Sequence, residues 1–218
     1  MVAAADPGEF PTGVVKLFIL GATGGIGRHL VSLALERGHQ VTAYVRAPQK
    51  IGTTHERLAV VQGDVFDPGQ LALGLAGHDA VLSAFGPLNI RSSTLRRQFG
   101  RTLATALRAG GVRRAQVVSA AFLFKGLGLG AAVLKATLFR QMIPDMAGME
   151  AEICQLDLDW TIVRPPRLTN GSARHAYRVA DGALPKGGFY ASRADVAHFM
   201  IGEAENPVHR QQVVGVAY

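Results

Sequence analysis

Gly21, Gly24 and Gly27 recur at intervals of three residues, directly after the apolar, β-branched segment 14–20. That segment is typical of a strand buried on both faces of a parallel sheet. The apolar residues that follow the glycines recur at roughly helical spacing and predict a helix. A strand, a glycine turn and a helix start expose free backbone N–H groups at the positive end of a helix dipole, which is the chemistry that binds an anion.

Each glycine has a separate physical use in such a turn. Gly21 permits the tight turn, Gly24 lets backbone N–H groups approach a pyrophosphate, and Gly27 lets the helix pack close to the strand. The pattern therefore predicts a dinucleotide site, and the alternative is a helix packed tightly on a strand with no ligand. The residues predicted to contact the pyrophosphate are Gly21, Thr23, Gly24, Gly25 and Ile26.

Basic residues follow the second predicted strand, residues 40–45. Sites that prefer NAD usually carry an acidic residue about 20 residues past the glycines, where it holds the ribose hydroxyls. Here that place belongs to Arg46, and Lys50 follows it. Because a guanidinium offers paired donors that match a phosphate, this change predicts NADP(H) as the cofactor. The alternative is a solvated basic loop.

Further strands are predicted at 58–62, 80–83, 116–119 and 159–164. Ligands of a doubly wound sheet lie beyond the carboxyl ends of its strands, so we expect the residues at these ends around one site. The small residues of 84–87 would let the backbone pass close to the cofactor. Asp64, after the strand at 58–62, is a predicted cofactor contact, and the alternative is that its carboxylate only forms a turn. These strand ends supply six more predicted cofactor contacts: Asp64, Val65, Phe85, Gly86, Ser119 and Pro165.

Strands and helices alternate along the chain, which predicts an α/β fold: a single Rossmann-type doubly wound parallel sheet with helices on both faces. Asp67 and Ser192 are the predicted N-caps of two helices. Residues 14–218 are predicted to form one NAD(P)-binding domain that includes the substrate pocket, after a flexible arm at 1–13. Helices are predicted at 25–37, 67–77, 92–108, 145–156 and from 193, a polar, loop-rich segment at 167–188 and a last strand at 212–216.

The composition suits one globular domain: 218 residues, 48% hydrophobic and 18% charged, with a formal net charge of +7. The single cysteine, Cys154, excludes internal disulfides and favours a reducing compartment. Since the N-terminus also lacks a signal-like pattern, we expect a cytoplasmic protein. No window of about 20 residues lacks charge, which predicts no membrane-spanning helix.

The most basic stretch predicts a solvated helix face rather than a nucleic-acid surface, because its one aromatic residue, Phe99, belongs to the apolar stripe of the helix and not to the basic face. We therefore expect no nucleic-acid partner, and also no metal, and a monomer or a homodimer. The apolar segment 122–142 leaves several roles open: a flap or wall of the substrate pocket, ordinary core, a dimer face or a membrane-surface patch. The cations of the basic stretch are Arg96, Arg97, Arg101, Arg108 and Arg113.

Taken together, these segments resemble the atypical short-chain dehydrogenase/reductases. Within that group they are most similar to the NAD(P)H-binding, NmrA-like branch that contains flavin reductase, also called biliverdin reductase B. The resemblance covers nearly the whole chain after the arm and implies a single Rossmann domain with NADPH as cofactor. It is carried by residues 21–27, 45–46, 63–65, 76–81, 121–123 and 158–166, and by Asp195 with residues 198–200.

The chain departs from the patterns of this group in ways that bear on the reaction. The better-known dehydrogenases move a proton with Tyr-x-x-x-Lys, but none of the four tyrosines here has a lysine four residues on. The flavin-reductase pattern has a hydroxyl pair where this chain has Ser119 and Ala120, and a histidine near the position of Met146. Interconversion of alcohols and ketones by a dedicated side-chain acid is therefore disfavoured.

Hydride transfer to a flat conjugated acceptor is compatible with these departures. A flavin, quinone or tetrapyrrole could stack on the nicotinamide while solvent provides the proton. Ser119 is then the candidate catalytic residue, as a hydrogen-bond donor, and Phe122, Pro166 and Arg167 are candidates for the substrate pocket. For Ser119, Phe122 and Pro166, the alternative roles are capping of a strand end and packing in the core. Rival functions are a non-catalytic NADP(H)-binding redox sensor of NmrA-like type and, less favoured, an isomerase or epimerase that keeps its cofactor.

Overall fold

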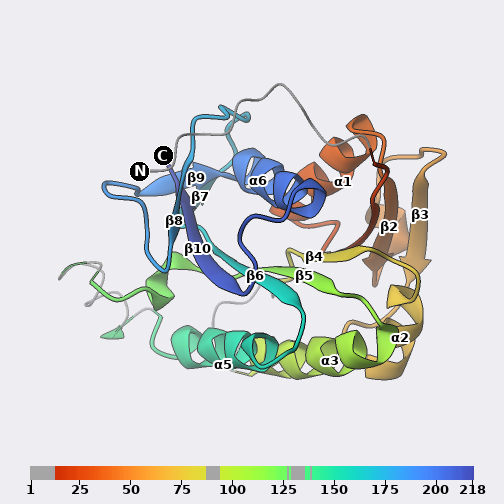
Figure 1. Ribbon diagram of the computed structural model, residues 1–218, viewed down its shortest axis with the longest axis horizontal. Coiled ribbons are helices and arrows are strands. Elements are labelled where there is room, and N and C mark those ends of the chain that lie inside the picture. The colour runs from red at the N-terminus through yellow and green to blue at the C-terminus, as the bar shows by residue number, and fades with distance from the viewer. Residues whose placement is uncertain (1–12, 87–93, 127, 129–135, 138) are drawn as a thin grey trace.

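The structure is a computed structural model, and it describes residues 13–86, 94–126, 128, 136–137 and 139–218 (Figure 1). Several sequence predictions lie outside the described residues: 1–12 of the arm, Pro87, the helix start at Ser92 and much of the apolar segment 122–142. Among the residues that are described, no helix has the length and apolar character needed to cross a membrane.

One sheet of eight strands forms the middle layer of the molecule (Figure 1). In space the strands are arranged β3-β2-β1-β4-β5-β6-β10-β8, all parallel except β8, which is antiparallel to β10. The chain order reverses between β1 and β4, so the predicted doubly wound architecture is confirmed and the switch point lies at the end of β1. The bounds are β1 Lys16–Leu20, β2 Gln40–Val45, β3 Leu58–Gln62, β4 Ala80–Ser83, β5 Arg114–Val118, β6 Asp159–Arg164, β8 Arg178–Asp181 and β10 Gln212–Ala217.

β1 shows why an unbroken apolar segment forms a central strand. Its residues Leu17 and Ile19 pack in one hydrophobic cluster, whereas Phe18 and Leu20 pack in another, and all four are fully buried. Since successive side chains of a strand point to opposite faces, burial on both faces requires an apolar residue at every position. The sheet therefore separates two cores.

The helices cover the two faces of the sheet as two separate layers (Figure 1). α1 (Gly25–Glu36) and α6 (Arg193–Glu205) pack on each other over the first cluster. α2 (Pro68–Leu75), α3 (Leu95–Gly110) and α5 (Met142–Cys154) cover the second cluster on the opposite face. The predicted helices on both faces are therefore confirmed.

The segment 167–188 contains more strand than the sequence predicts. β7 (Arg167–Thr169) pairs with β9 (Tyr190–Ser192) in a separate two-stranded sheet, and β8 forms an edge of the main sheet. Strands of three or four residues are too short to show an alternating pattern, so their partners rather than their own sequence specify them. β5 is also shifted by two residues at its start, because Arg114 and Ala115 already pair with β6.

The basic face predicted on α3 is solvated only in part, and the prediction is wrong for Arg96. Its side chain is buried, and the carboxylate of Asp145 on α5 accepts hydrogen bonds from the N–H groups of Arg96 and Arg97, at 3.1 and 2.9 Å. Asp145 therefore caps the start of α3 instead of the start of its own helix. α5 begins at Met142, three residues earlier than predicted, so Asp145 lies within its first turn.

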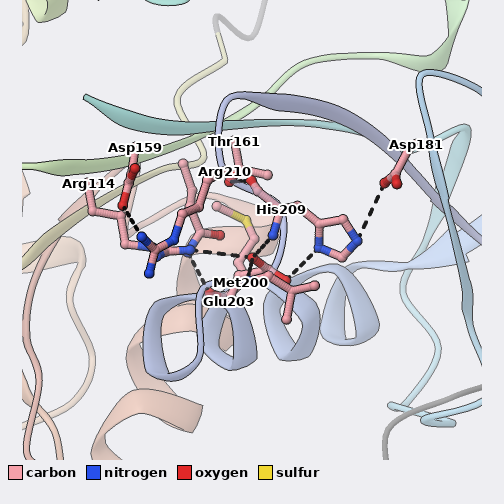
Figure 2. A network of polar contacts seen from close by, with 10 residues as sticks. Arg114, Asp159, Thr161, Asp181, Met200, Glu203, His209 and Arg210 are labelled. Carbon is pink, nitrogen blue, oxygen red and sulfur yellow. Dashed lines mark hydrogen bonds and ion pairs between the residues drawn. The ribbon is translucent and has the colours of Figure 1, made fainter. Parts of the chain in front are cut away.

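A polar network lies where strands β5, β6 and β10 begin, and Figure 2 shows Glu203 of α6 at its centre. The buried carboxylate of Glu203 accepts from Nη2 of Arg114 at 3.4 Å and contacts Nδ1 of His209 at 2.6 Å. The backbone N–H groups of Val208 and His209 donate to the same carboxylate at 3.2 and 3.1 Å. One acidic side chain thus joins α6, β5 and the loop before β10.

The charges of Glu203 and His209 support each other. The hydrogen bond to Glu203 raises the pKa of His209 above its ordinary value, against the effect of burial, and the charges of Glu203 and Asp181 add to the rise. Burial acts to raise the pKa of Glu203, but the hydrogen bonds and charge of His209 outweigh it and leave that pKa lowered. Folding therefore favours the protonated imidazole beside the ionised carboxylate.

Stability that depends on a protonated His209 should be lost as the pH rises. The folded pKa lies above the unfolded value of 6.5, so the stabilisation is present below 6.5 and disappears as the pH rises through the folded pKa. We expect the free energy of urea unfolding to fall across this range in the native protein, and this component of the fall to be absent in His209→Asn. A difference between the two proteins that stays constant from about pH 6 to about pH 9 would contradict this assignment.

Candidate functional site

The glycine turn brings the end of β1, the end of β4 and the start of α1 together, backbone against backbone. Gly21 has a φ of +76°, and a Cβ atom there would lie 2.7 Å from the carbonyl carbon of Ala84. A Cβ atom at Gly27 would lie only 2.0 Å from the carbonyl oxygen of Gly21. The N–H of Gly24 donates to that same oxygen at 2.8 Å, which closes the turn. The tight turn and the close helix packing predicted for Gly21 and Gly27 are therefore physical requirements of this structure.

The first turn of α1 differs from those of three other helices, because no side chain caps it. α2 is capped by Asp67, α6 by Ser192 and α3 by Asp145. α1 follows Gly24, which makes no side-chain cap, and has no acidic residue in its first turn. Within the described part of the chain, the N–H groups of residues 25–27 have no acceptor. Free donors at the positive end of a helix fit an anionic group such as a pyrophosphate.

Cations without carboxylate partners lie beyond the end of β2. Arg46 and Lys50 are both exposed, and neither forms an ion pair with any residue that the structure describes. Lys50 lines a cavity of about 500 Å³ together with Ala22 of the glycine turn and Arg28 of α1, whereas Arg46 does not line it. The surplus of positive charge beside the glycine turn favours an anionic ligand.

Asp64 and Val65 follow β3 at the same edge of the sheet. Asp64 is exposed, and its carboxylate accepts the N–H of Phe66 at 3.0 Å, which is the turn geometry given above as the alternative. Val65 is buried in the cluster under α2, so its side chain serves the core and only its backbone is available to a ligand. A contact of Asp64 with the cofactor stays a prediction.

Phe85 and Gly86 follow β4, where the chain passes the glycine turn. The Phe85 ring belongs to the second core, with its centroid 4.4 Å from that of Phe99 and 5.8 Å from that of Phe66. Its backbone is close to Gly21, because a Cβ atom on Gly21 would lie 2.9 Å from the Phe85 nitrogen. Gly86 is exposed. The predicted close passage of the backbone is present, while the aromatic ring is directed to packing.

Ser119 and Pro165 lie together because β5 and β6 remain paired beyond their ends. The N–H of Ser119 donates to the carbonyl of Val163 at 2.7 Å, and the N–H of Ala121 donates to the carbonyl of Pro165 at 3.0 Å. The Ser119 hydroxyl is buried and has no hydrogen-bond partner among the described residues. A buried hydroxyl without a partner costs about 1–3 kcal/mol, so its presence at the ligand edge of the sheet fits a group that accepts a hydrogen bond there.

The predicted pocket residues lie at the ends of the same two strands. Phe122 is half-buried in the short 3₁₀ helix Ala121–Leu123, and its ring centroid is 4.4 Å from that of Phe139. Pro166 is half-buried directly after β6, and Arg167 is exposed at the start of β7. These residues present apolar surface and one exposed cation, Arg167, close to Ser119 and Pro165 along the chain.

Arg164 is a neighbour of this region that the sequence analysis did not single out. Its Nε and Nη2 atoms donate to the carboxylate of Glu150 at 2.9 and 2.5 Å, and its guanidinium lies 4.7 Å from the ring centroid of Phe124. The arginine thereby ties α5 and the segment after the 3₁₀ helix to the end of β6. Its position at a strand end could be predicted, but its partners could not, because they come from other elements.

Asp195 has more partners than its place in the predicted helix start requires. It is fully buried, and it accepts from Ser192 Oγ at 2.7 Å, from the N–H of His175 at 2.9 Å, from the N–H of Arg174 at 3.1 Å and from the Tyr218 hydroxyl. Burial acts to raise its pKa, but the hydrogen bonds outweigh burial and lower it. The capping-box form of residues 192–195 predicts the start of α6, but not the contacts of Asp195 with residues 174–175 and Tyr218.

Two other titratable groups are poorly suited to catalysis. Burial raises the pKa of the Cys154 thiol to about 11, so the nucleophilic thiolate is scarce at neutral pH. Burial also lowers the pKa of His198 to about 4, and its Nδ1 atom lies 2.8 Å from the hydroxyl of Tyr177, whose pKa burial raises to about 12. The Cys154 thiol and the His198 imidazole therefore both remain in their neutral forms near pH 7.

Solved structures and curated sequences share this architecture. The chain is 27% identical over 209 residues to the uncharacterized protein YwnB of Bacillus subtilis, covering 91% of this chain and 96% of that protein. It superposes on a "putative epimerase" from Bacteroides thetaiotaomicron with a TM-score of 0.79 and 26% identity, over 94% of this chain and 98% of that one. It also superposes on a "putative NADH-flavin reductase" from Streptococcus pneumoniae, with a TM-score of 0.75 and 23% identity over 93% and 99% of the chains, a likeness that bears on the fold alone.

The family follows from a match that spans most of the chain. The model of the NAD(P)H-binding family covers residues 21–207, from the first glycine of the turn to the loop before β10. That range includes all the strand ends described above, and the described donors at α1 fit the dinucleotide that such a family holds. This chain is a member of the NAD(P)H-binding family.

Proposed function

We propose that the protein is an NADPH-dependent reductase that transfers hydride to a flat conjugated acceptor, such as a flavin, a quinone or a tetrapyrrole-like molecule. The observation that carries the proposal is the uncapped first turn of α1, with exposed cations at Arg46 and Lys50 that form no ion pair within the described ranges. An anion at the turn and a second phosphate at the end of β2 together match NADP(H) better than NAD(H).

Each part of the site takes one part of the dinucleotide in this proposal. The N–H groups of residues 25–27 bind the pyrophosphate, and Arg46 and Lys50 bind the phosphate on the ribose. Residues 64–65 lie toward the adenine, and Ser119 with Pro165 toward the nicotinamide, following the order of strands from the switch point. When bound there, NADPH supplies the hydride for the reduction.

The protein's own contribution is to orient the reactants and to exclude water. The half-buried Phe122 and Pro166 offer apolar surface against which a flat ring can lie. Ser119 has a hydroxyl proton without an acceptor, and it can donate to the nicotinamide or to the acceptor. Solvent provides the proton, because the chain has no Tyr-x-x-x-Lys pair and a delocalised ring does not require one at the moment of transfer.

The comparisons bear on this substrate class through the fold. The Streptococcus pneumoniae protein named a "putative NADH-flavin reductase" has the same fold over nearly the whole chain, so this fold is compatible with reduction of a flavin. A second candidate function, a redox sensor that binds NADP(H) without turnover, is favoured by one observation: the Ser119 hydroxyl is buried rather than open to an acceptor. Binding and turnover must therefore be measured separately.

The preference for the extra phosphate depends on two side chains. In the double variant Arg46→Gln with Lys50→Gln, we expect the Kd for NADPH to rise about tenfold or more, because charged hydrogen bonds to the phosphate are lost. The Kd for NADH should change less than about twofold, since NADH lacks that phosphate. Fluorescence titration measures both, with the double variant Arg101→Gln with Arg108→Gln, at two exposed positions on α3, as the charge-matched control. Equal losses for the two cofactors would contradict the assignment.

Turnover is measured by oxidation of NADPH in the presence of FMN, riboflavin and a series of quinones. We expect at least one of these acceptors to be reduced at a rate well above that of NADPH alone. A protein that binds NADPH but reduces none of them would support the sensor in place of the reductase. A protein that binds neither NADPH nor NADH would overturn both functions.

Ser119 should show opposite effects on stability and on turnover. Ser119→Ala removes a buried hydroxyl that has no partner, so the free energy of unfolding should stay the same or rise by up to about 1 kcal/mol. Turnover should fall about tenfold if the hydroxyl donates to the reacting groups. Thr161→Val is the control, because Thr161 donates to the His209 carbonyl at 2.6 Å and its loss should reduce stability only. A Ser119→Ala variant with normal turnover would exclude the catalytic role.

A further inference from the structure

The side chain of Arg193, the first residue of α6, lies across the first turn of α1. A Cβ atom at Gly25 would be 2.5 Å from both Cδ and Nε of Arg193, and 3.6 Å from its guanidinium carbon. The dinucleotide pattern alone gives no reason for a second consecutive glycine after Gly24. In this structure, Gly25 is small because an arginine from another helix occupies the space beside it.

The position of Arg193 is electrostatically unfavourable in the protein alone. Its guanidinium lies at the start of α1, whose first N–H groups have no acceptor in the part of the chain that the structure describes, and its backbone is the start of α6. Positive charge is disfavoured at the N-terminus of either helix. No carboxylate among the described residues pairs with it, and the one contact described is from Nη1 to the neutral Oδ1 of Asn170, at 2.6 Å. An anion at this point would relieve the repulsion.

The fold holds this arrangement at both ends of the two helices. The start of α6 is fixed by Asp195, with its bonds to Ser192, residues 174–175 and Tyr218. At the other end, Glu205 of α6 accepts from Arg37 at 2.7 Å and contacts Nε2 of His39 at 2.8 Å. Since α1 and α6 cannot shift freely along each other, the guanidinium is positioned before any ligand arrives.

We propose that Arg193 is a further cofactor-binding residue, whose guanidinium bonds the pyrophosphate of NADP(H) beside the first turn of α1, with Asn170 holding the side chain in place. This inference rests on the proposed function, because it requires a dinucleotide in the site. Arg193 and Gly25 then act together. Gly25 leaves space for the Arg193 side chain, and the guanidinium adds a positive charge for the pyrophosphate beside the uncapped start of α1. Arg193 acts on the pyrophosphate, whereas Arg46 and Lys50 act on the ribose phosphate.

The test compares two ligands on the full-length protein. NADPH carries both phosphate groups, whereas adenosine 2′-monophosphate carries the ribose phosphate without a pyrophosphate. For Arg193→Gln, we expect the Kd for NADPH to rise about tenfold or more and the Kd for adenosine 2′-monophosphate to stay within about twofold of the native value. Arg193→Lys should recover part of the affinity, because it restores the charge without the paired donors. The matched control Arg101→Gln should change neither Kd.

Asn170→Asp tests the same idea without removing the arginine. The new carboxylate is the same size as the amide and would pair with the Arg193 guanidinium, in competition with the pyrophosphate. We expect this variant also to bind NADPH more weakly, with adenosine 2′-monophosphate unaffected. Because the arginine stays in place, this arm remains informative if Arg193→Gln does not fold, which circular dichroism would show.

The outcomes separate this inference from the proposed function. If the native protein binds no NADPH, the proposed function fails and the inference fails with it. If the native protein binds NADPH and both Arg193→Gln and Asn170→Asp bind it equally well, only the inference on Arg193 is overturned. If Arg193→Gln weakens both ligands by the same factor, its effect is not specific to the pyrophosphate, and the inference is again overturned.

Discussion

The backbone contact between the end of β1 and the first turn of α1 is the constraint on which the site depends. A Cβ atom at Gly27 would lie 2.0 Å from the Gly21 oxygen, and one at Gly21 would meet the backbone of Ala84 at 2.7 Å. Three elements therefore meet at the switch point with no side chains between them. The N–H groups of residues 25–27, in the first turn of α1, have no acceptor among the residues that the structure describes, which makes the junction suitable for an anion.

The charged and polar groups beside the helix starts differ between α1 and three other helices. Carboxylates and a hydroxyl satisfy the starts of α2, α3 and α6, where Asp67, Asp145 and Ser192 accept backbone N–H groups. At α1 the chain instead brings a cation, Arg193, close to the helix start. A capped helix gains stability on its own, whereas a helix start beside a cation gains it only with an anion. Of these four helix starts, that of α1 is the one without a side-chain cap among the described residues.

Much of the fold could be predicted because its signals are local. The bounds of β2, β3, β4 and β6 match the prediction, as do the caps at Asp67 and Ser192, since apolar runs, turns and capping side chains act within a few residues. The missed features depend on contacts between distant segments. Arg96 is buried because Asp145 lies against it, and the partner of Arg164 is on another helix. The short strand β8 exists because β10 offers it an edge.

The sequence predicts which strand ends form the candidate site. It does not predict which side chains at those ends pack in the core and which remain available to a ligand. The sequence predicts cofactor contacts at Val65, Phe85 and Ser119. The structure packs the side chains of Val65 and Phe85 in or against the core and leaves the Ser119 hydroxyl without a partner among the described residues. Backbone groups and one hydroxyl are what such a site can offer to the reacting end of a cofactor. The proposed hydride transfer to a flat acceptor is compatible with these groups. It needs orientation of the reactants more than a proton from the protein, because a delocalised ring can take its proton from water.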